Sequence, residues 1–325
     1  MGFIFNMDNN NLSTGYIEPA IYPNNIKEVK AVSLTDLLNM NLPPRENLLD
    51  PWLPKSGLCM VYATRGIGKT FFALEVTMAI ACGINFLSFR APHPAKVLYI
   101  DGEMPANVMQ SRLRSIKERI NSAHPNIDII EPLLITPDLQ GDCTIDLSTN
   151  EGHLLIEKHT KNAELIVIDN ISTLAGSLKE NDATDWMPFQ QLLLKLRKQG
   201  KSVLLVHHAG KGGNQRGTSK REDILDTVIA LKRPNDYEAS DGASFELYFE
   251  KNRGILGDDT KPIFCQLVNN NWSYSTLEES NYAKAIALYN EGLQQKDIVL
   301  ELNISKSQVS KIIKKGKSLG EIKRD

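Results

Sequence analysis

Residues 63–70 read ATRGIGKT, and they stand between the apolar run LCMVYA (58–63) and the helical pattern FFALEVTMAIA (71–81). This arrangement is typical of a phosphate-binding loop, in which glycines let backbone N–H groups curl around phosphates at a helix N-terminus. The lysine of such a loop reaches the β- and γ-phosphate oxygens, and the hydroxyl that follows it binds Mg²⁺. We therefore predict an ATP and Mg²⁺ site formed by Arg65, Gly66, Ile67, Gly68, Lys69, Thr70 and Phe71.

One position departs from the usual pattern, because Ala63 stands where the first glycine of GxxxxGK[ST] is expected. Alanine is small enough to preserve the turn. The alternative interpretation is a glycine-rich turn without a ligand, but the order strand, loop, helix favours the phosphate loop.

Outward from this loop, short apolar runs alternate with longer helical patterns as far as about Val268. Several runs lack a polar face, as strands buried on both sides of a sheet do. The alternation predicts an α/β fold with a wound, mostly parallel sheet, followed by antiparallel strands at one edge. The expected parallel strands are 58–63, 96–101, 127–135, 164–169, 202–208 and 226–231, and the expected helices are 70–82, 105–121, 150–161 and 184–199.

The two ends of the chain differ from this middle part. Residues 1–33 are rich in asparagine and weakly patterned, and Ser33 is placed to cap a short helix, LTDLLNM. Near the other end, short helical patterns replace strands. We expect a flexible arm over 1–33, a P-loop ATPase domain over 34–278 and a small all-α domain over 279–325.

Composition excludes several classes of protein. The chain has 325 residues, 42% of them hydrophobic, and four scattered cysteines with no CxxC, so a zinc or disulfide framework is not expected. It has no secretory signal pattern and no run of 18 apolar residues, which favours a cytoplasmic protein without a membrane span. The net charge is −2, yet residues 301–325 hold seven basic and three acidic side chains. Any DNA contact is therefore expected from local patches.

Two acidic strand ends are candidates for the chemistry of hydrolysis. Asp169 ends the run ELIVID and is placed to hold Mg²⁺ opposite Thr70. Asn170 follows it, so the adjacent glutamate of many motor ATPases is missing. Glu103, at the end of VLYIDGE, is the alternative residue to polarise the attacking water. A first-turn or N-cap carboxylate of the next helix is the competing interpretation of Glu103.

His207 and His208 end a third strand, at the edge where wound sheets bind ligands. We predict that His208 senses the γ-phosphate, although a histidine in this position can also be an ordinary core residue. The basic, glycine-rich segment that follows contains Arg216 and is either a DNA-contacting loop or a solvated loop.

The motif order resembles the RecA-like ATPases, most of all the hexameric plasmid RepA and DnaB-type replicative helicases. The resemblance rests on ATRGIGKT, DGE (101–103), IVIDN (166–170), VHHAGK (206–211) and KNR (251–253). The segments DPWLP and LYIDGEMPA also resemble AAA-type ATPases of plasmids and mobile elements. The resemblance implies Glu103 as the catalytic glutamate and His208 as the sensor. It also implies that Lys251 and Arg253 reach into the ATP site of a neighbouring subunit.

Arginine suits that last role because it is always charged and forks across phosphate oxygens. The competing interpretation of Arg253 is a surface residue of an edge strand. If it completes a neighbour's site, the active form is a homo-oligomer, and a hexameric ring is expected from the resemblance.

The segment GLQQKDIVLELNISKSQVSKIIKK (292–315) resembles the helix-turn-helix of bacterial resolvases and regulators. In such modules the N-terminal residues of the second helix meet base edges in the major groove. The competing interpretation is a helical lid on the ATPase or on a partner protein. The predicted DNA contacts are Ser305, Lys306, Ser307, Gln308 and Lys311.

Two functions are consistent with these features. The first is a replicative DNA helicase of a plasmid or mobile element, running on single-stranded DNA. The second is a regulator that binds duplex DNA and uses ATP as an assembly switch.

Overall fold

The computed structural model describes residues 29–176, 186–210, 222–255 and 257–323. The chain divides into two units, Met1–Pro44 and Arg45–Asp325. In the first unit, helix α1 (Leu34–Asn39) begins after Ser33, whose hydroxyl accepts a hydrogen bond from the Asp36 N–H. The predicted cap is thus present, and no α1 residue is buried.

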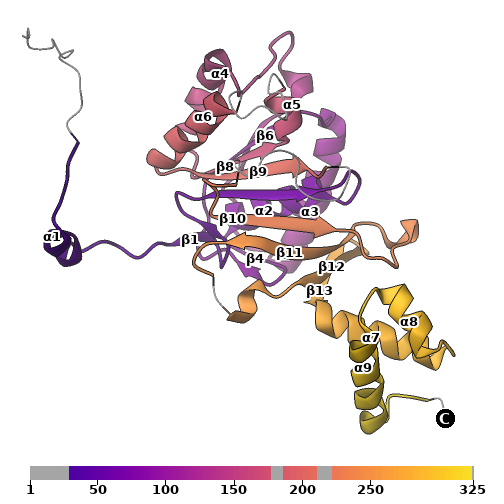
Figure 1. Ribbon diagram of the computed structural model, residues 1–325. Helices are drawn as coiled ribbons and strands as arrows, with labels where there is room; N and C mark the ends of the chain where they lie inside the picture. Colours follow the sequence, from indigo (N-terminus) through magenta and orange to yellow (C-terminus); the bar gives the residue numbers. More distant parts are fainter. Residues whose placement is uncertain (1–28, 177–185, 211–221, 256, 324–325) are drawn as a thin grey trace, which may run out of the picture. The chain divides into compact units, whose positions relative to one another are not determined.

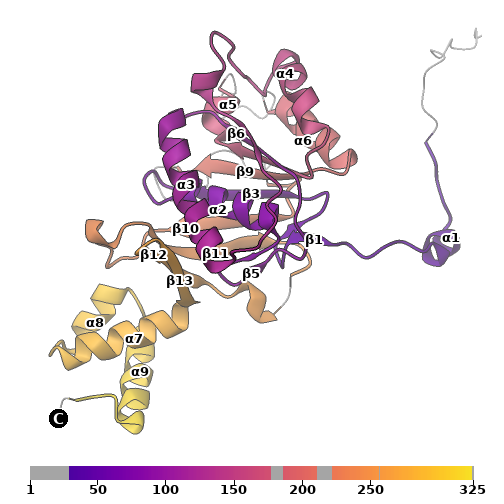
Figure 2. The same ribbon diagram turned by 180° about the vertical axis from the view of Figure 1, so that it is seen from behind.

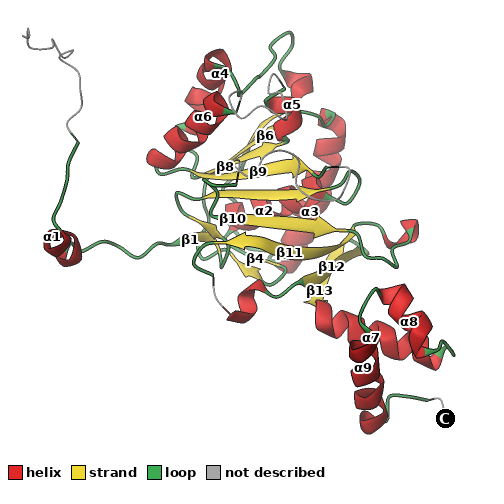
Figure 3. Ribbon diagram, viewed as in Figure 1, coloured by secondary structure: helices red, strands yellow, loops and turns green. Residues whose placement is uncertain are grey.

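The second unit is built on one sheet, which has nine strands within the described residues (Figures 1 and 3). Six neighbouring strands run parallel, and three antiparallel strands extend one edge, as the alternation predicts. In spatial order they are β7 (Leu133–Ile135), β6 (Val97–Asp101), β8 (Leu165–Asp169), β9 (Ser202–His208), β3 (Leu58–Ala63), β10 (Thr227–Lys232), β11 (Ser244–Asn252), β12 (Ile263–Val268) and β13 (Asn271–Thr276).

Helices cover both faces of the parallel part. Helices α2 (Lys69–Cys82) and α3 (Ala106–Ala123) pack on one face (Figure 2), and α4 (Asn150–Thr160), α5 (Ile171–Leu174) and α6 (Met187–Lys198) pack on the other. Strand β3 is buried along its whole length, with Cys59, Val61 and Ala63 in the first core and Leu58, Met60 and Tyr62 in the second. This explains why its sequence has no polar face.

Short elements that the sequence patterns do not predict close one end of the α2 core. Trp52 and Phe89 are fully or nearly fully buried there and meet edge to face. These elements are two hairpins, β1 (Asn47–Leu49) with β2 (Leu53–Pro54) and β4 (Asn85–Phe86) with β5 (Phe89–Arg90). Elsewhere in the chain, 3₁₀ turns form at η1 (Pro137–Leu139), η3 (Ala239–Asp241) and η4 (Gly257–Thr260).

The expected strand over 127–135 is wrong for most of its length, since only Leu133–Ile135 forms β7. Pro132 has no N–H to donate to a sheet ladder. The preceding residues are held instead by helix α2, because the Ile130 N–H donates to the Ala81 carbonyl. An apolar run can therefore pack on a helix without becoming a strand.

The last three helices, α7 (Leu277–Asn290), α8 (Gln295–Leu302) and α9 (Lys306–Leu319), form a bundle with its own core (yellow in Figure 1). Asn303 adopts the left-handed conformation (φ 50°) between α8 and α9, and Ser305 caps α9 through the Gln308 N–H. Both features agree with the expected turn. The buried core is Ala285, Ile286, Ile298, Leu302, Val309 and Ile313. Among the described helices, none is long and apolar enough to cross a bilayer.

Candidate active site

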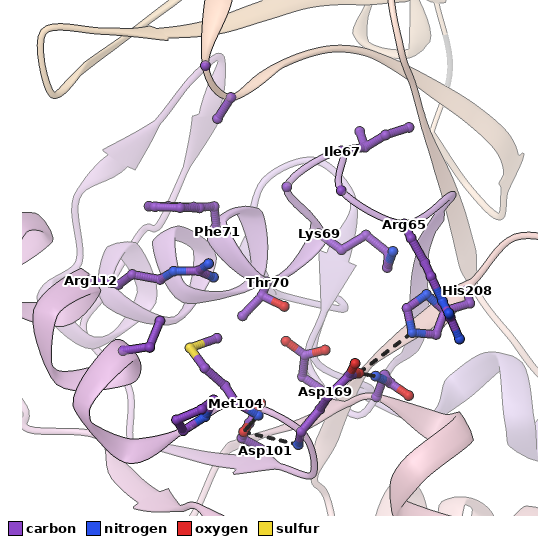
Figure 4. Close-up of a pocket in the computed structure, with 18 residues that line it drawn as sticks. Arg65, Ile67, Lys69, Thr70, Phe71, Asp101, Met104, Arg112, Asp169 and His208 are labelled. Atoms are coloured by element: carbon purple, nitrogen blue, oxygen red, sulfur yellow. Dashed lines mark hydrogen bonds and ion pairs between the residues drawn. The ribbon is translucent and has the colours of Figure 1, made fainter. Parts of the chain in front are cut away.

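A cavity of about 590 Å³ lies at the carboxyl edge of the parallel strands (Figure 4). Strands β3, β6, β8 and β9 are adjacent in the sheet, so the loops that follow them meet at one place. Ligands of wound sheets bind at this edge. The residues that line the cavity are Arg65, Gly66, Ile67, Gly68, Lys69, Thr70, Phe71, Asp101, Glu103, Met104, Pro105, Val108, Arg112, Asp169, Asn170, His208, Gly242 and Ala243.

The backbone of the P-loop adopts conformations that favour glycine at two positions. Gly66 (φ 77°) and Gly68 (φ 111°) both occupy conformations that disfavour a side chain, and Gly68 is the N-cap of α2. The Lys69 ammonium donates to the carbonyls of Ala63 (3.1 Å) and Thr64 (3.0 Å). Burial lowers the pKa of Lys69, while the charges of nearby carboxylates oppose that shift. The Lys69 side chain is thus bound to the backbone of the same loop in which it is expected to contact phosphate.

The strand ends Asp101 and Asp169 are direct neighbours in the sheet. The Tyr99 hydroxyl donates to Asp169 Oδ2 at 2.6 Å and fixes that carboxylate. Burial raises the pKa of Asp169, whereas its hydrogen bonds with Tyr99 and Thr70 oppose the rise. Burial also raises the pKa of Asp101 to about 7, and the charge of Asp169 adds to this effect.

Glu103 faces the cavity from the turn between β6 and α3. One oxygen of its carboxylate accepts a hydrogen bond of 2.6 Å from the Asn170 side-chain amide and lies 3.8 Å from His208 Nε2. Asp101 braces this turn by accepting from the N–H groups of Glu103 and Met104. The N-cap position of α3 is Pro105, so Glu103 does not occupy it.

His208 lines the same end of the cavity, beside Arg65 (Figure 4). Burial lowers the pKa of His208, and the neighbouring Lys69 charge lowers it further. The charge of Glu103 opposes these two effects. Its Nδ1 has no hydrogen-bond partner within the described residues. His207, in contrast, is directed into the protein and is only 2% exposed.

The opposite end of the cavity contains Phe71, Met104 and Arg112 (Figure 4). The Arg112 guanidinium lies over the Phe71 ring, 4.5 Å from its centroid. Of these two, only Phe71 was expected at the site. The signal that could have revealed the wall is the spacing of Val108 and Arg112, which are four residues apart and so lie on one side of α3.

The structure does not bring the predicted pair Lys251 and Arg253 to this cavity. Lys251 donates to the Glu222 carbonyl, and Arg253 donates to the Asp223 carbonyl at 2.7 Å. Burial lowers the pKa of Lys251, and the nearby Arg253 charge lowers it further. Both side chains thus bind the backbone of their own chain.

None of the candidate DNA contacts within the described residues lines the cavity. Arg216 falls outside the described residues. Ser305 is the N-cap of α9, and the other candidates occupy its first two turns. All five are exposed: Ser305, Lys306, Ser307, Gln308 and Lys311.

A P-loop at the head of α2, facing a buried carboxylate at the end of a neighbouring strand, defines a RecA-like P-loop ATPase fold. The family model described as "AAA domain" matches residues 23–214, more than half of the chain. The chain belongs to this family.

A crystal structure of a KaiC-like protein, PH0186, from the hyperthermophilic archaeon Pyrococcus horikoshii OT3 has a similar fold. The TM-score is 0.50 at 17% sequence identity, and the similarity covers 70% of this chain and 94% of that one. At this sequence identity the structural similarity shows only that the two chains have a similar fold. No curated protein matches the chain.

Proposed function

We propose that the protein hydrolyses ATP to ADP and phosphate in a Mg²⁺-dependent reaction. The observation that carries the proposal is the meeting of four functional groups around one cavity: the Lys69 ammonium, the Asp169 carboxylate, the Glu103 carboxylate and the His208 imidazole. Family membership supports nucleotide binding at the same loop.

The residues present fit the metal that such ATPases use. The Thr70 hydroxyl and the Asp169 carboxylate are close enough to share a hydrogen bond, and both offer the oxygen ligands that Mg²⁺ prefers. We assign Mg²⁺ to these two groups. When bound, the ion neutralises charge on the β- and γ-phosphate oxygens.

The other groups divide the work of hydrolysis. Lys69 and the P-loop N–H groups from Arg65 to Phe71 hold the phosphates, and the α2 N-terminus adds its dipole. Glu103 orients the attacking water and accepts its proton. His208, which lies 3.8 Å from Glu103, reports the presence of the γ-phosphate.

The trans role of Lys251 and Arg253 belongs to an oligomeric form of the protein. Both donate to backbone carbonyls of their own chain, and Arg253 remains partly exposed. Exchanging these carbonyl contacts for a neighbour's ATP would complete a site between subunits. A hexameric ring is the assembly that we propose, as the resemblance to RepA and DnaB-type helicases implies.

We further propose that the ATPase acts on DNA, as a helicase of plasmid or mobile-element replication. The support is the joining of a hydrolytic cavity to a C-terminal bundle whose α9 presents basic side chains to solvent. The exposed lysines of this helix are Lys306, Lys311, Lys314, Lys315 and Lys317.

A second candidate function is an ATP-switched regulator that binds duplex DNA. The turn between α8 and α9 favours it, because Asn303 and Ser305 build a compact connection typical of a helix-turn-helix. A motor that runs on single strands has no need of such duplex recognition.

Two assays on the full-length protein separate these functions. The first compares the ATPase rate with and without single-stranded DNA, and the second measures strand displacement on a forked duplex. Stimulation with unwinding supports the motor. Hydrolysis indifferent to single strands, together with tight binding to one duplex, supports the regulator instead.

Lys69→Ala should abolish hydrolysis under either function. Lys158→Ala, which removes an exposed lysine of α4 remote from the cavity, is the matched control and should leave the rate unchanged. If Lys69→Ala hydrolyses ATP as fast as that control, the proposed ATPase site is wrong.

A further inference from the structure

Asn170 occupies the position after Asp169, where many motor ATPases have a second carboxylate. It is 3% exposed and lines the cavity. Its amide nitrogen donates to Glu103 Oε2 at 2.6 Å, while its amide oxygen accepts from the Thr173 N–H at 3.2 Å and caps α5. One buried side chain therefore connects a helix end to the candidate hydrolytic carboxylate.

The two contacts fix the direction of the amide group. A backbone N–H needs an acceptor, and the acceptor of an asparagine amide is its oxygen. Once that oxygen faces Thr173, the NH₂ group must face Glu103. Asn170 thus presents donor hydrogens to Glu103 regardless of whether the glutamate is in place.

Glu103 depends on such support because its own surroundings constrain it little. Its side chain is 62% exposed, and in the described part of the chain its carboxylate meets Asn170 at 2.6 Å and His208 at 3.8 Å. An exposed glutamate otherwise samples many rotamers. The short bond to Asn170 selects one of them.

The backbone brings the two residues within reach of one another. The Gly102 N–H donates to the Asp169 carbonyl at 2.8 Å. A Cβ at position 102 would lie 2.5 Å from Thr173 Oγ1 and 2.7 Å from Leu174 Cγ, so the turn before Glu103 packs directly on α5. Glycine is required for this approach.

We propose that Asn170 is a positioning residue, whose amide holds the Glu103 carboxylate in the orientation used to activate water. This inference rests on the proposed function of Glu103. It gives Asn170 a donor role that a second carboxylate in the same place could not fulfil.

The test uses Asn170→Asp, because aspartate caps helices as well as asparagine but places a second negative charge beside Glu103. Steady-state ATPase kinetics of the full-length protein should show kcat reduced by roughly 10- to 100-fold, a part of the general-base contribution. The KM for ATP should stay within about twofold, because the phosphate-binding groups are unchanged. Asn150→Asp, the same change at an exposed first residue of α4, should leave kcat unaltered.

Glu103→Gln and the double variant Glu103→Gln with Asn170→Asp identify the route of the effect. If Asn170 acts through Glu103, the double variant should be no slower than Glu103→Gln alone. Wild-type kcat in Asn170→Asp, or additive losses in the double variant, would overturn the positioning role. Wild-type kcat in Glu103→Gln would instead overturn the proposed role of Glu103 itself. Thermal unfolding of each variant confirms that the fold is intact.

Discussion

The ATPase sheet and the C-terminal bundle place their candidate functional residues in opposite ways. Around the sheet edge, Lys69, Asp169 and Asn170 are all less than 10% exposed, and each makes a hydrogen bond with another residue of the ATPase region. In the bundle, the candidate contacts such as Lys306 and Lys311 are exposed, and a separate apolar core holds the helices. In the first region the candidate functional residues are themselves buried in the folded structure. In the second region the candidate functional residues and the core residues are different sets.

This difference predicts which substitutions change function without changing the stability of the fold. A buried charged group near the sheet edge is surrounded by hydrogen-bond partners and other charges that set its properties. We therefore expect its replacement to alter catalysis strongly. An exposed lysine of α9 has little to do with stability. Five substitutions test this division.

The largest effect is expected for Asp169→Asn, which removes a charged ligand from the proposed Mg²⁺ site. We expect kcat to fall by about 10³-fold or more, since transition-state charge on the phosphoryl group is then poorly neutralised. Steady-state hydrolysis at saturating Mg²⁺ measures this. Asp128→Asn, at an exposed position outside the cavity, is the control, and equal rates in the two variants would contradict the assignment.

Ile298→Ala should separate the stability of the two regions. Ile298 is fully buried in the bundle core, and such a truncation costs about 2–5 kcal/mol. We expect the bundle to unfold at lower temperature and duplex binding to be lost, while ATP hydrolysis in the absence of DNA continues. A parallel loss of hydrolysis would show that the two regions are not independent.

Asp101→Asn should change the pH dependence of stability in the nucleotide-free and Mg²⁺-free protein. Burial raises the pKa of Asp101 in the folded state to about 7. The contribution of this carboxyl group to the free energy of unfolding is therefore fully present below the pKa that it has in the unfolded chain. This contribution is lost as the pH rises through 7. Removing the group should flatten the slope between about pH 4 and 7 by up to roughly 1.4 kcal/mol per pH unit. Urea unfolding at several pH values measures the slope, and an unchanged slope would contradict the shift.

The smallest effect is expected for Lys306→Gln and Lys311→Gln. If each lysine contacts a phosphate, either change should lower duplex affinity a few-fold and reduce the salt slope of log K by about 0.9. Titrations at several salt concentrations measure both quantities. Lys158→Gln should bind as the parent does, and neither α9 variant should alter the DNA-free ATPase rate.

The sequence predicts those parts of the molecule that obey a local rule. The P-loop, the buried strands and the caps at Ser33 and Ser305 each follow from residue type and spacing. The segment 127–132 does not, because its apolar residues pack on α2 and Pro132 interrupts the ladder. Pro132 is a local signal against a strand, whereas the packing on α2 has no local signal.

The candidate site was predictable to the extent that it consists of strand ends. Glu103, Asp169 and His208 were expected from that rule, and the structure brings them to one cavity. The partnership of Asn170 with Glu103 joins residues 67 positions apart through a side-chain rotamer, which spacing alone does not reveal. The assignment of Lys251 and Arg253 to a neighbour's ATP remains a prediction that depends on assembly.

The strand order has a consequence for how the protein is made. Strand β3, which carries the P-loop, is the first strand of the large sheet to leave the ribosome, yet both of its partners come much later in the chain. Leu58 pairs beside Val203, and Cys59 pairs beside Thr227. Such distant pairings form slowly, because a long loop must close before any contact rewards it. The phosphate loop is therefore synthesised before either of the strands that flank β3.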